Sequence, residues 1–300
     1  MNFSEYTLAS FGDSFTFGDE TVPDYPRGEW DMEESQQQWK TDCNLNSYTQ
    51  VIADRFKFKD SINFGVLGGS NDRSLSLLEP YLHNHKEKKI FVMFNFTHPA
   101  RFMNFFKHAK NEEYKPIDIS PGYVDGSGIE ERQYAGLTAK SIANQYTFWK
   151  NSIQDVYDHV RTRRMLYYIL STHNTPHVTF DILNTMDSRI LRDNPLQWMT
   201  TDKDIDGSLI PHSDEIVRKV DFLQTYYDEL KDDVHRLSHI GIKYHNNQNF
   251  HKYIGNLGKK DHANRFYYTT SNVGEGGHWT TEGHVKVSNV IEKFINERYN

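Results

Sequence analysis

The sequence predicts an α/β fold in which helices cover both faces of a parallel sheet. Three short strands are predicted, at Tyr6 to Phe11, Ser61 to Phe64 and Lys89 to Phe94, and the apolar run KIFVMF of the last is typical of a strand buried on both faces. Segments with helical apolar spacing alternate with them, as expected for parallel strands joined by right-handed crossovers. At 300 residues, the chain is long enough for one large domain of this kind.

Apolar spacing and turn residues predict the elements between these strands. Ser47 is expected to begin a short helix whose apolar face carries Tyr48, Val51, Ile52 and Phe56. Glycines 65, 68 and 69 end the second strand, and a further helix follows with Leu75, Leu77, Leu78 and Leu82. The first half therefore has the alternating pattern of an α/β domain.

The second half continues this alternation. Helical spacing predicts a helix over Ile142 to Val160. Met165 to Leu170 is expected to be a strand or a continuation of that helix, and Val178 to Leu183 a strand. Two last helices are predicted over Ile216 to Leu237 and Thr281 to Ile295.

Two polar stretches are expected to be insertions into a single domain that spans residues 1–300. The first, at about residues 19–46, is acidic and contains Pro23, Pro26 and Gly28. The second, at about residues 107–140, includes the turn-rich segment PGYVDGSG. The first is expected to be an insertion or a long loop, and the second is predicted to lie on the surface.

Composition excludes several functions. A formal net charge of −7 provides no basic field to attract nucleic acid or an anionic membrane. Cys43 is the only cysteine, which excludes an intramolecular disulfide and a multi-thiolate metal site. The N-terminus has neither a basic region nor a long apolar region, so we expect a soluble protein made without export, in the cytoplasm.

The first chemically suggestive segment is LASFGDSFTFGDE, which begins at Leu8. Ser14 follows a predicted buried strand and lies at the carboxyl edge of the sheet, where open α/β folds bind their ligands. Two interpretations are open, because Ser14 suits a nucleophile while Gly12, Asp13 and Ser14 also suit a simple turn. The GxSxG elbow of the α/β-hydrolases is absent, since Gly12 and Gly18 do not flank this serine at that spacing.

The second segment is GEGGHWTTEGH, near the C-terminus. His278 stands in a glycine-rich loop with Glu275 three residues before it, and Thr280 or Thr281 is placed to cap the last helix. A loop histidine beside a carboxylate suits a general base whose tautomer is held by a hydrogen bond. A metal site of Glu275, His278 and His284 matches no known ligand spacing and is disfavoured.

The third segment is NFGVLGGSND, from Asn63 to Asp72. Glycine here allows a backbone N–H to approach a ligand, and the start of the following helix favours negative charge. The order G-x-G-x-x-G is absent, and no Walker lysine follows, so a nucleotide cradle is disfavoured.

Together, these three segments resemble the ordered blocks of the SGNH, or GDSL-type, hydrolases. The resemblance implies that Ser14 is the nucleophile, that Gly68 donates its N–H to the oxyanion, and that Glu275 and His278 correspond to the family's D-x-x-H. It also implies a three-layer α/β/α, flavodoxin-like fold with a five-stranded parallel sheet. The implied reaction is ester hydrolysis through an acyl-enzyme, with neither a metal nor an organic cofactor.

The chain departs from the family pattern in two places. After the third strand, where the family has G-x-N-D, this chain has Asn95-Phe-Thr97-His98, so either Thr97 or Asn95 is a candidate side-chain donor to the oxyanion. Glu275 replaces the family's aspartate. Two roles for it are open: it orients His278, or a backbone carbonyl does so while Glu275 is a solvated loop acid. Asp13 is expected to brace the turn.

Arg101 and His98 also follow the third strand and are weaker candidates for substrate binding. Arg101 is expected either to bind a substrate carboxylate or phosphate, or to form an ion pair that holds its loop. The polar, aromatic insertions suggest a polar ester such as an O-acetylated carbohydrate. A small-molecule or glycan ester is therefore the expected partner, without nucleic acid or membrane, and the oligomeric state is not predicted.

Two alternative functions remain open from the sequence. The altered third and last blocks also suit a catalytically impaired binding or structural protein of this fold. The same acyl-enzyme would serve an O-acyltransferase. The segment THPARF is similar to SGNH-type proteins of tailed phages, which implies the host cytoplasm or a virion as the location.

Overall fold

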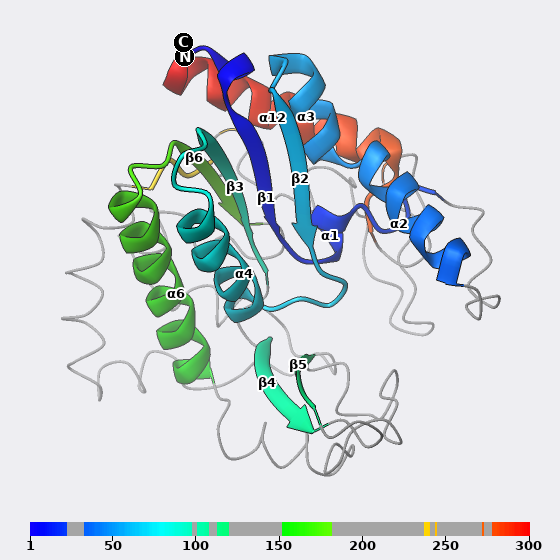
Figure 1. The fold of residues 1–300 in the computed structure, drawn as a ribbon, viewed down its shortest axis with the longest axis vertical. Coiled ribbons are helices and arrows are strands. Elements are labelled where there is room, and N and C mark those ends of the chain that lie inside the picture. Colours follow the sequence, from blue (N-terminus) through cyan, green and yellow to red (C-terminus); the bar gives the residue numbers. More distant parts are fainter. Residues whose placement is uncertain are drawn as a thin grey trace.

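A computed structural model of the chain has a parallel sheet in the strand order β2-β1-β3-β6 (Figure 1). These strands are Asp60–Gly65, Thr7–Gly12, Ile90–Phe96 and His177–Asp181. The structure describes residues 1–22, 33–97, 101–107, 113–119, 152–181, 237–240, 244, 272 and 278–300. Every residue of the two central strands, β1 and β3, is buried, which explains why both consist mostly of apolar residues.

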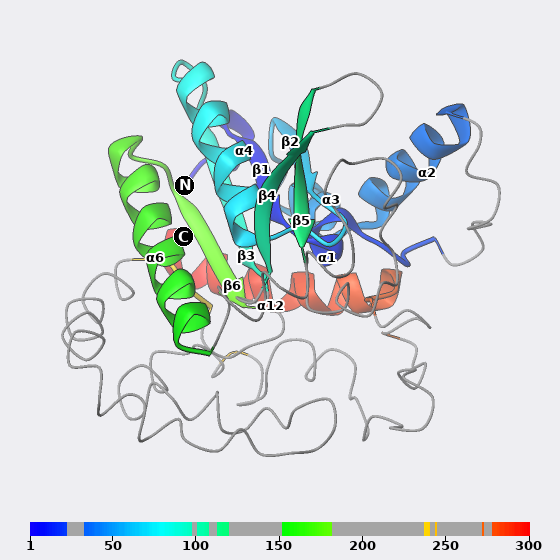
Figure 2. The ribbon, with the colours of Figure 1, turned by 90° about the horizontal axis from the view of Figure 1, so that it is seen from below.

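Two layers of helices cover the sheet, as predicted. Helices α3 (Tyr48–Phe56) and α12 (Thr281–Tyr299) pack together on one face, and α4 (Asn71–Asn84) and α6 (Ser152–Thr172) pack together on the other (Figures 1 and 2). Alternate residues of the central strands separate the two cores. Leu8 and Phe91 belong to the core beneath α3 and α12, and Ala9 and Val92 to the core beneath α4 and α6.

The sheet has four strands in the described part of the chain, so the predicted number of five is wrong there. A single parallel bridge joins Thr179 of β6 to His239, on the side of β6 away from β3. One bridge does not make a strand, because a strand needs several successive residue pairs.

The segment Met165–Leu170 is helical, so its prediction as a strand is wrong and its alternative, a continuation of the preceding helix, is confirmed. Leu166 and Leu170 lie four residues apart in α6 and are both buried. The part of the predicted helix before residue 152, and nearly all of the helix predicted over Ile216 to Leu237, lie outside the described residues.

Three described elements belong to the two predicted insertions or border them. Helix α2 (Glu33–Asn46) occupies the end of the first insertion, where a long loop was an alternative. Its Trp39 and Cys43 pack against Phe17, which joins the insertion to the main domain. Strands β4 (Phe102–Lys107) and β5 (Tyr114–Ile119) form an antiparallel hairpin at the second.

The described residues show neither a membrane span nor a metal cluster. None of the helices in these ranges is both long and apolar enough to cross a membrane. Within the same ranges, no three side chains of His, Cys, Asp or Glu are grouped in a way that would hold a metal ion.

Helices α3 and α12 are joined by a buried histidine. The Tyr48 N–H, at the start of α3, donates to Nδ1 of His284 at 2.9 Å, and the Tyr48 and His284 rings stack with centroids 5.6 Å apart. Because Nδ1 accepts this bond, the ring is neutral with its proton on Nε2. Burial, and secondarily the nearby His278, lower the pKa of His284 to about 3.

This arrangement predicts a specific acid sensitivity. The unfolded chain binds a proton at His284 near pH 6.5, whereas the folded chain resists it until about pH 3, so this residue's contribution to stability is complete above pH 6.5 and falls as the pH drops. Between pH 7 and pH 5, the free energy of unfolding should fall by about 2 kcal/mol through His284 alone.

Urea denaturation of the wild type and of His284→Asn at both pH values checks this. The asparagine keeps an acceptor for the Tyr48 N–H but does not titrate, so the fall in stability between the two pH values should be smaller by that amount. Equal falls in both proteins would contradict the assignment.

Candidate active site

Ser14 lies at the carboxyl edge of the sheet, where β1 ends. Asp13 caps the single-turn helix α1 (Ser14–Phe17) by accepting the Phe15 N–H, and Gly18 ends it at φ 92°. This turn needs small neighbours. A Cβ on Gly65 would lie 2.2 Å from the Phe17 backbone nitrogen, so glycine in β2 is what allows α1 to approach the sheet.

The structure brings Ser14 and His278 together, although they lie 264 residues apart in sequence. Ser14 Oγ and His278 Nε2 are 2.8 Å apart, a hydrogen-bond distance. The following residues position the histidine: Trp279 is fully buried against Phe15, and Thr280 caps α12, as predicted. Ser14 therefore has an imidazole nitrogen at hydrogen-bond distance, which is the arrangement that a serine nucleophile requires.

Two acids approach the other side of the imidazole. His278 Nδ1 lies 3.3 Å from Oδ2 of Asp19 and 3.7 Å from Oε2 of Glu20. The His278 backbone N–H also donates to Oε2 of Glu20 at 2.7 Å. The predicted partner Glu275 lies outside the described residues. The sequence analysis did not identify either acid as a neighbour of His278. The one signal in the sequence was that both acids directly follow Gly18, close to Ser14.

Gly68 lies in a tight loop after β2. It has φ 67°, and the loop is tied to β1 by a bond from the Val66 N–H to the Gly12 carbonyl. Within the described ranges, neither the Gly68 N–H nor the Ser14 N–H has a hydrogen-bond acceptor. Both remain available as donors to a bound group.

The predicted side-chain donors Thr97 and Asn95 bond elsewhere. Thr97 Oγ1 donates to Oδ2 of Asp13 at 2.7 Å, and Asn95 Nδ2 donates to Oδ1 of Asp13 at 3.2 Å and to Thr16 at 3.1 Å. In this arrangement, neither side chain has a proton left for an oxyanion. Their assignment to the oxyanion stays a prediction that requires these bonds to rearrange.

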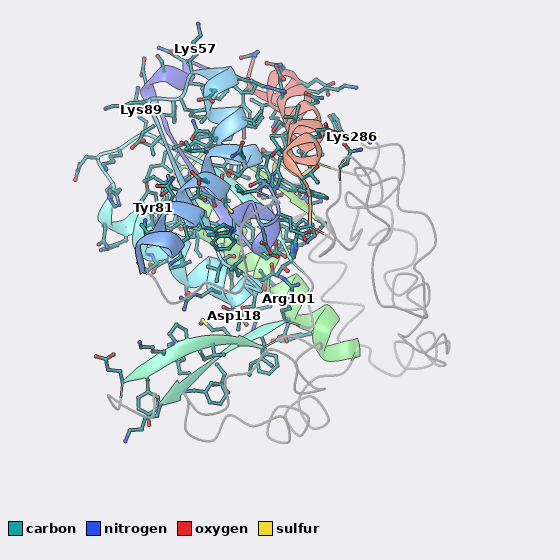
Figure 3. The ribbon with its side chains drawn as sticks, turned by 90° about the vertical axis from the view of Figure 1, so that its right-hand side faces the viewer. Lys57, Tyr81, Lys89, Arg101, Asp118 and Lys286 are labelled. Atoms are coloured by element: carbon teal, nitrogen blue, oxygen red, sulfur yellow. The ribbon has the colours of Figure 1, made fainter. Side chains whose placement is uncertain are left out.

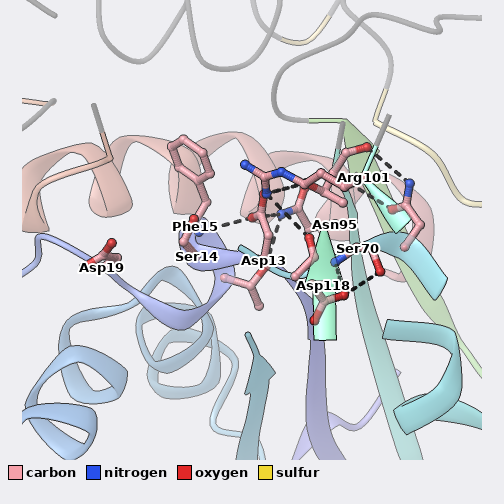
Figure 4. A network of polar contacts seen from close by, with 12 residues as sticks. Asp13, Ser14, Phe15, Asp19, Ser70, Asn95, Arg101 and Asp118 are labelled. Atoms are coloured by element: carbon pink, nitrogen blue, oxygen red, sulfur yellow. Dashed lines mark hydrogen bonds and ion pairs between the residues drawn. The ribbon is translucent and has the colours of Figure 1, made fainter. Parts of the chain in front are cut away.

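Asp13 is the centre of this network (Figure 4). Its carboxylate is fully buried and accepts from Phe15, Asn95, Thr97 and Arg101, the last as an ion pair at 2.9 Å. Arg101 therefore makes the ion pair that was one of its two predicted roles, and Asp13 braces the turn as expected. His98, the other weak candidate, lies outside the described residues.

The β4–β5 hairpin contacts the loop between β2 and α4 through Asp118, which lies near Arg101 (Figure 3). Its Oδ1 accepts the Ser70 N–H at 2.9 Å and the Ser70 hydroxyl at 2.6 Å. Burial raises the pKa of Asp118, and these two bonds oppose the rise. The hairpin thus holds the loop that carries Gly68, a role that the sequence analysis did not predict.

Comparisons with known proteins give likenesses to solved structures only. No protein-family model matches the chain, and neither does any curated protein at a significant level. The chain is similar to a proposed lipolytic protein of the G-D-S-L family from Desulfitobacterium hafniense, at 9% identity and a TM-score of 0.39, over 96% of this chain and 98% of that one.

Two further solved structures are similar over most of their length. An α/β hydrolase enzyme from the metagenome of Lake Arreo, Spain, is 10% identical with a TM-score of 0.43, over 97% of this chain and 95% of that one. A member of the lipolytic protein G-D-S-L family from Veillonella parvula is 11% identical with a TM-score of 0.35, over 98% of each chain. At scores this low, the likenesses indicate neither an activity nor a substrate for this chain.

The Asp13 network predicts a large loss of stability on neutralising one buried charge. In Asp13→Asn, an amide group replaces the oxygen that accepts from Thr97 and Arg101, and the guanidinium loses its partner. The free energy of unfolding at pH 7 should fall by about 3 kcal/mol, measured by urea denaturation.

Arg101→Met is the matched variant, because it leaves the Asp13 carboxylate with its three uncharged donors. The free energy of unfolding should fall less in Arg101→Met than in Asp13→Asn, since Arg101 is partly exposed and the three remaining hydrogen bonds still satisfy the carboxylate. A larger loss in Arg101→Met would show that the arginine, rather than the aspartate, organises the network.

Proposed function

We propose that the chain is a serine ester hydrolase of the SGNH, or GDSL, type. The single observation that carries this is the 2.8 Å contact between Ser14 Oγ and His278 Nε2 at the carboxyl edge of a parallel sheet. Two features support it: the unpaired Ser14 and Gly68 N–H groups in the described part of the chain, and the acids beside Nδ1.

The reaction starts with Ser14. With its proton on Nδ1, His278 accepts the Ser14 hydroxyl proton at Nε2 as Ser14 Oγ attacks the ester carbonyl carbon. The carbonyl oxygen becomes an oxyanion, to which the Ser14 and Gly68 N–H groups donate. Collapse of this intermediate breaks the ester bond, and the leaving alkoxide takes the proton from Nε2.

Water completes the cycle. His278 removes a proton from water, the hydroxide attacks the acyl-enzyme carbonyl, and Ser14 Oγ leaves with that proton. The products are one acid and one alcohol. Each step uses only groups of this chain and water.

The substrate that we propose is a polar ester, with an O-acetylated carbohydrate as the first choice. Acids lie beside His278, and Arg101 reaches the same edge of the sheet, so charged groups lie near Ser14. A hydrolase for short acyl groups should prefer p-nitrophenyl acetate to the octanoate, and rates over an acyl-chain series measure this. A preference for octanoate would contradict the polar substrate.

Ser14→Ala tests the nucleophile. We expect its hydrolysis of p-nitrophenyl acetate to fall at least about 10³-fold below that of the wild type, because the acyl-enzyme cannot form. A fluorophosphonate probe should label the wild type on Ser14, as mapped by mass spectrometry, and should leave Ser14→Ala unlabelled.

The same experiment separates the alternatives. Equal rates in Ser14→Ala and wild type, without labelling, would favour a binding or structural protein that retains the fold. An acylated sugar formed in the presence of a competing acceptor would favour an O-acyltransferase, and product analysis detects it.

A further inference from the structure

We propose that Asp19 is the positioning residue that orients the His278 imidazole and stabilises its protonated form, in the place that the sequence pattern assigns to Glu275. This proposal rests on the proposed function, because it concerns the base of that reaction. The carboxylate would come from the turn that follows the nucleophile instead of from the loop that carries the histidine.

The imidazole lies between two groups of one short segment. Nε2 is 2.8 Å from Ser14 Oγ, and Nδ1 is 3.3 Å from Asp19 Oδ2. The two ring nitrogens therefore meet the nucleophile and an acid at opposite sides, as a triad requires. The Asp19 contact is at ion-pair distance but is not aligned as a hydrogen bond, and catalytic bonds of this kind commonly tighten when substrate binds.

Asp19 is held at a fixed position relative to Ser14. The Gly18 and Asp19 N–H groups both donate to the Ser14 carbonyl at 3.1 Å, which closes the turn after α1. The Thr21 hydroxyl donates to the Gly18 carbonyl at 2.7 Å and secures the same turn. The backbone that presents the nucleophile thus also presents the acid.

Glu20 has a different task from its neighbour. Its carboxylate accepts the His278 backbone N–H at 2.7 Å, whereas its distance to Nδ1 is 3.7 Å. A second tie follows, because the Thr281 hydroxyl donates to the Thr21 carbonyl at 2.9 Å. Glu20 and Thr21 hold the histidine's main chain against the segment that carries Ser14, which leaves Asp19 to act on the ring.

The electrostatics agree with this division. When His278 takes the Ser14 proton, the ring becomes a cation, and two carboxylates within 4 Å of Nδ1 stabilise it. Asp19 Oδ2 is the nearer of the two oxygens. Its side chain is 18% exposed, so the attraction is less screened than it would be in bulk water.

Asp19→Asn is the first test, with p-nitrophenyl acetate as substrate. The amide removes the charge that favours the cationic ring and the correct tautomer, so kcat should fall about 10³-fold while KM changes little. Asp19→Glu, which restores the charge, should recover a substantial part of this loss. Asp54→Asn, an exposed aspartate in α3, is the matched control and should keep wild-type kinetics.

Glu275→Gln tests the competing acid in the same assay. We expect its loss in kcat to be at least tenfold smaller than that of Asp19→Asn. An equal or larger loss in Glu275→Gln would overturn the proposal, and so would wild-type kcat in Asp19→Asn.

A second measurement does not depend on turnover. In protein labelled with ¹⁵N-histidine, the Nδ1–H of His278 should give a downfield proton resonance that Asp19→Asn loses and Glu275→Gln retains. The opposite pattern would overturn the proposal. Fluorophosphonate labelling of Ser14 in the wild type separates the two claims, since labelled Ser14 with an unimportant Asp19 rejects this inference and leaves the proposed function standing.

Discussion

The burial of one carboxylate, that of Asp13, is the constraint on which the site depends. A charge removed from water is costly unless donors replace its hydration, and Asp13 receives four of them from three parts of the chain. Phe15 belongs to α1, Asn95 lies in β3 with Thr97 directly after it, and Arg101 leads into β4. Satisfying this carboxylate therefore places the turn that carries Ser14 against the central strand and brings the hairpin to the same edge.

The second part of the site depends on the far end of the chain. Helix α12 lies along α3, with Trp279 buried against Phe15 and Tyr48, and with His284 buried against Tyr48. The chain ends meet as well, since the Met1 ammonium donates to the Tyr299 carbonyl at 2.8 Å. Because His278 directly precedes Trp279, the packing of the last helix helps to set where the His278 ring lies.

The elements whose patterns are local were predicted well. Apolar runs indicated the strands, and the residues Ser47 and Thr280 marked the starts of α3 and α12. Met165–Leu170 failed as a strand because a short apolar run has the same composition in a buried helix. The turn of Ser14 was notable because it follows a buried strand at the edge of the sheet, where ligands bind in this class of fold, whereas Gly68 was assigned from the resemblance of its segment to a family block.

Taken alone, the sequence determined the class of fold and the two candidates for nucleophile and base, Ser14 and His278, since these follow from periodicity and from short motifs. Only the tertiary structure decided which side chains lie next to Ser14 and His278. It placed Asp19 and Glu20 beside His278, directed Thr97 and Asn95 toward Asp13, and brought Asp118 to the loop of Gly68. Each of these contacts joins residues that are distant in sequence or that a turn brings together. The sequence alone does not predict them, because the turn at Gly18 and the packing of α12 decide where these side chains point.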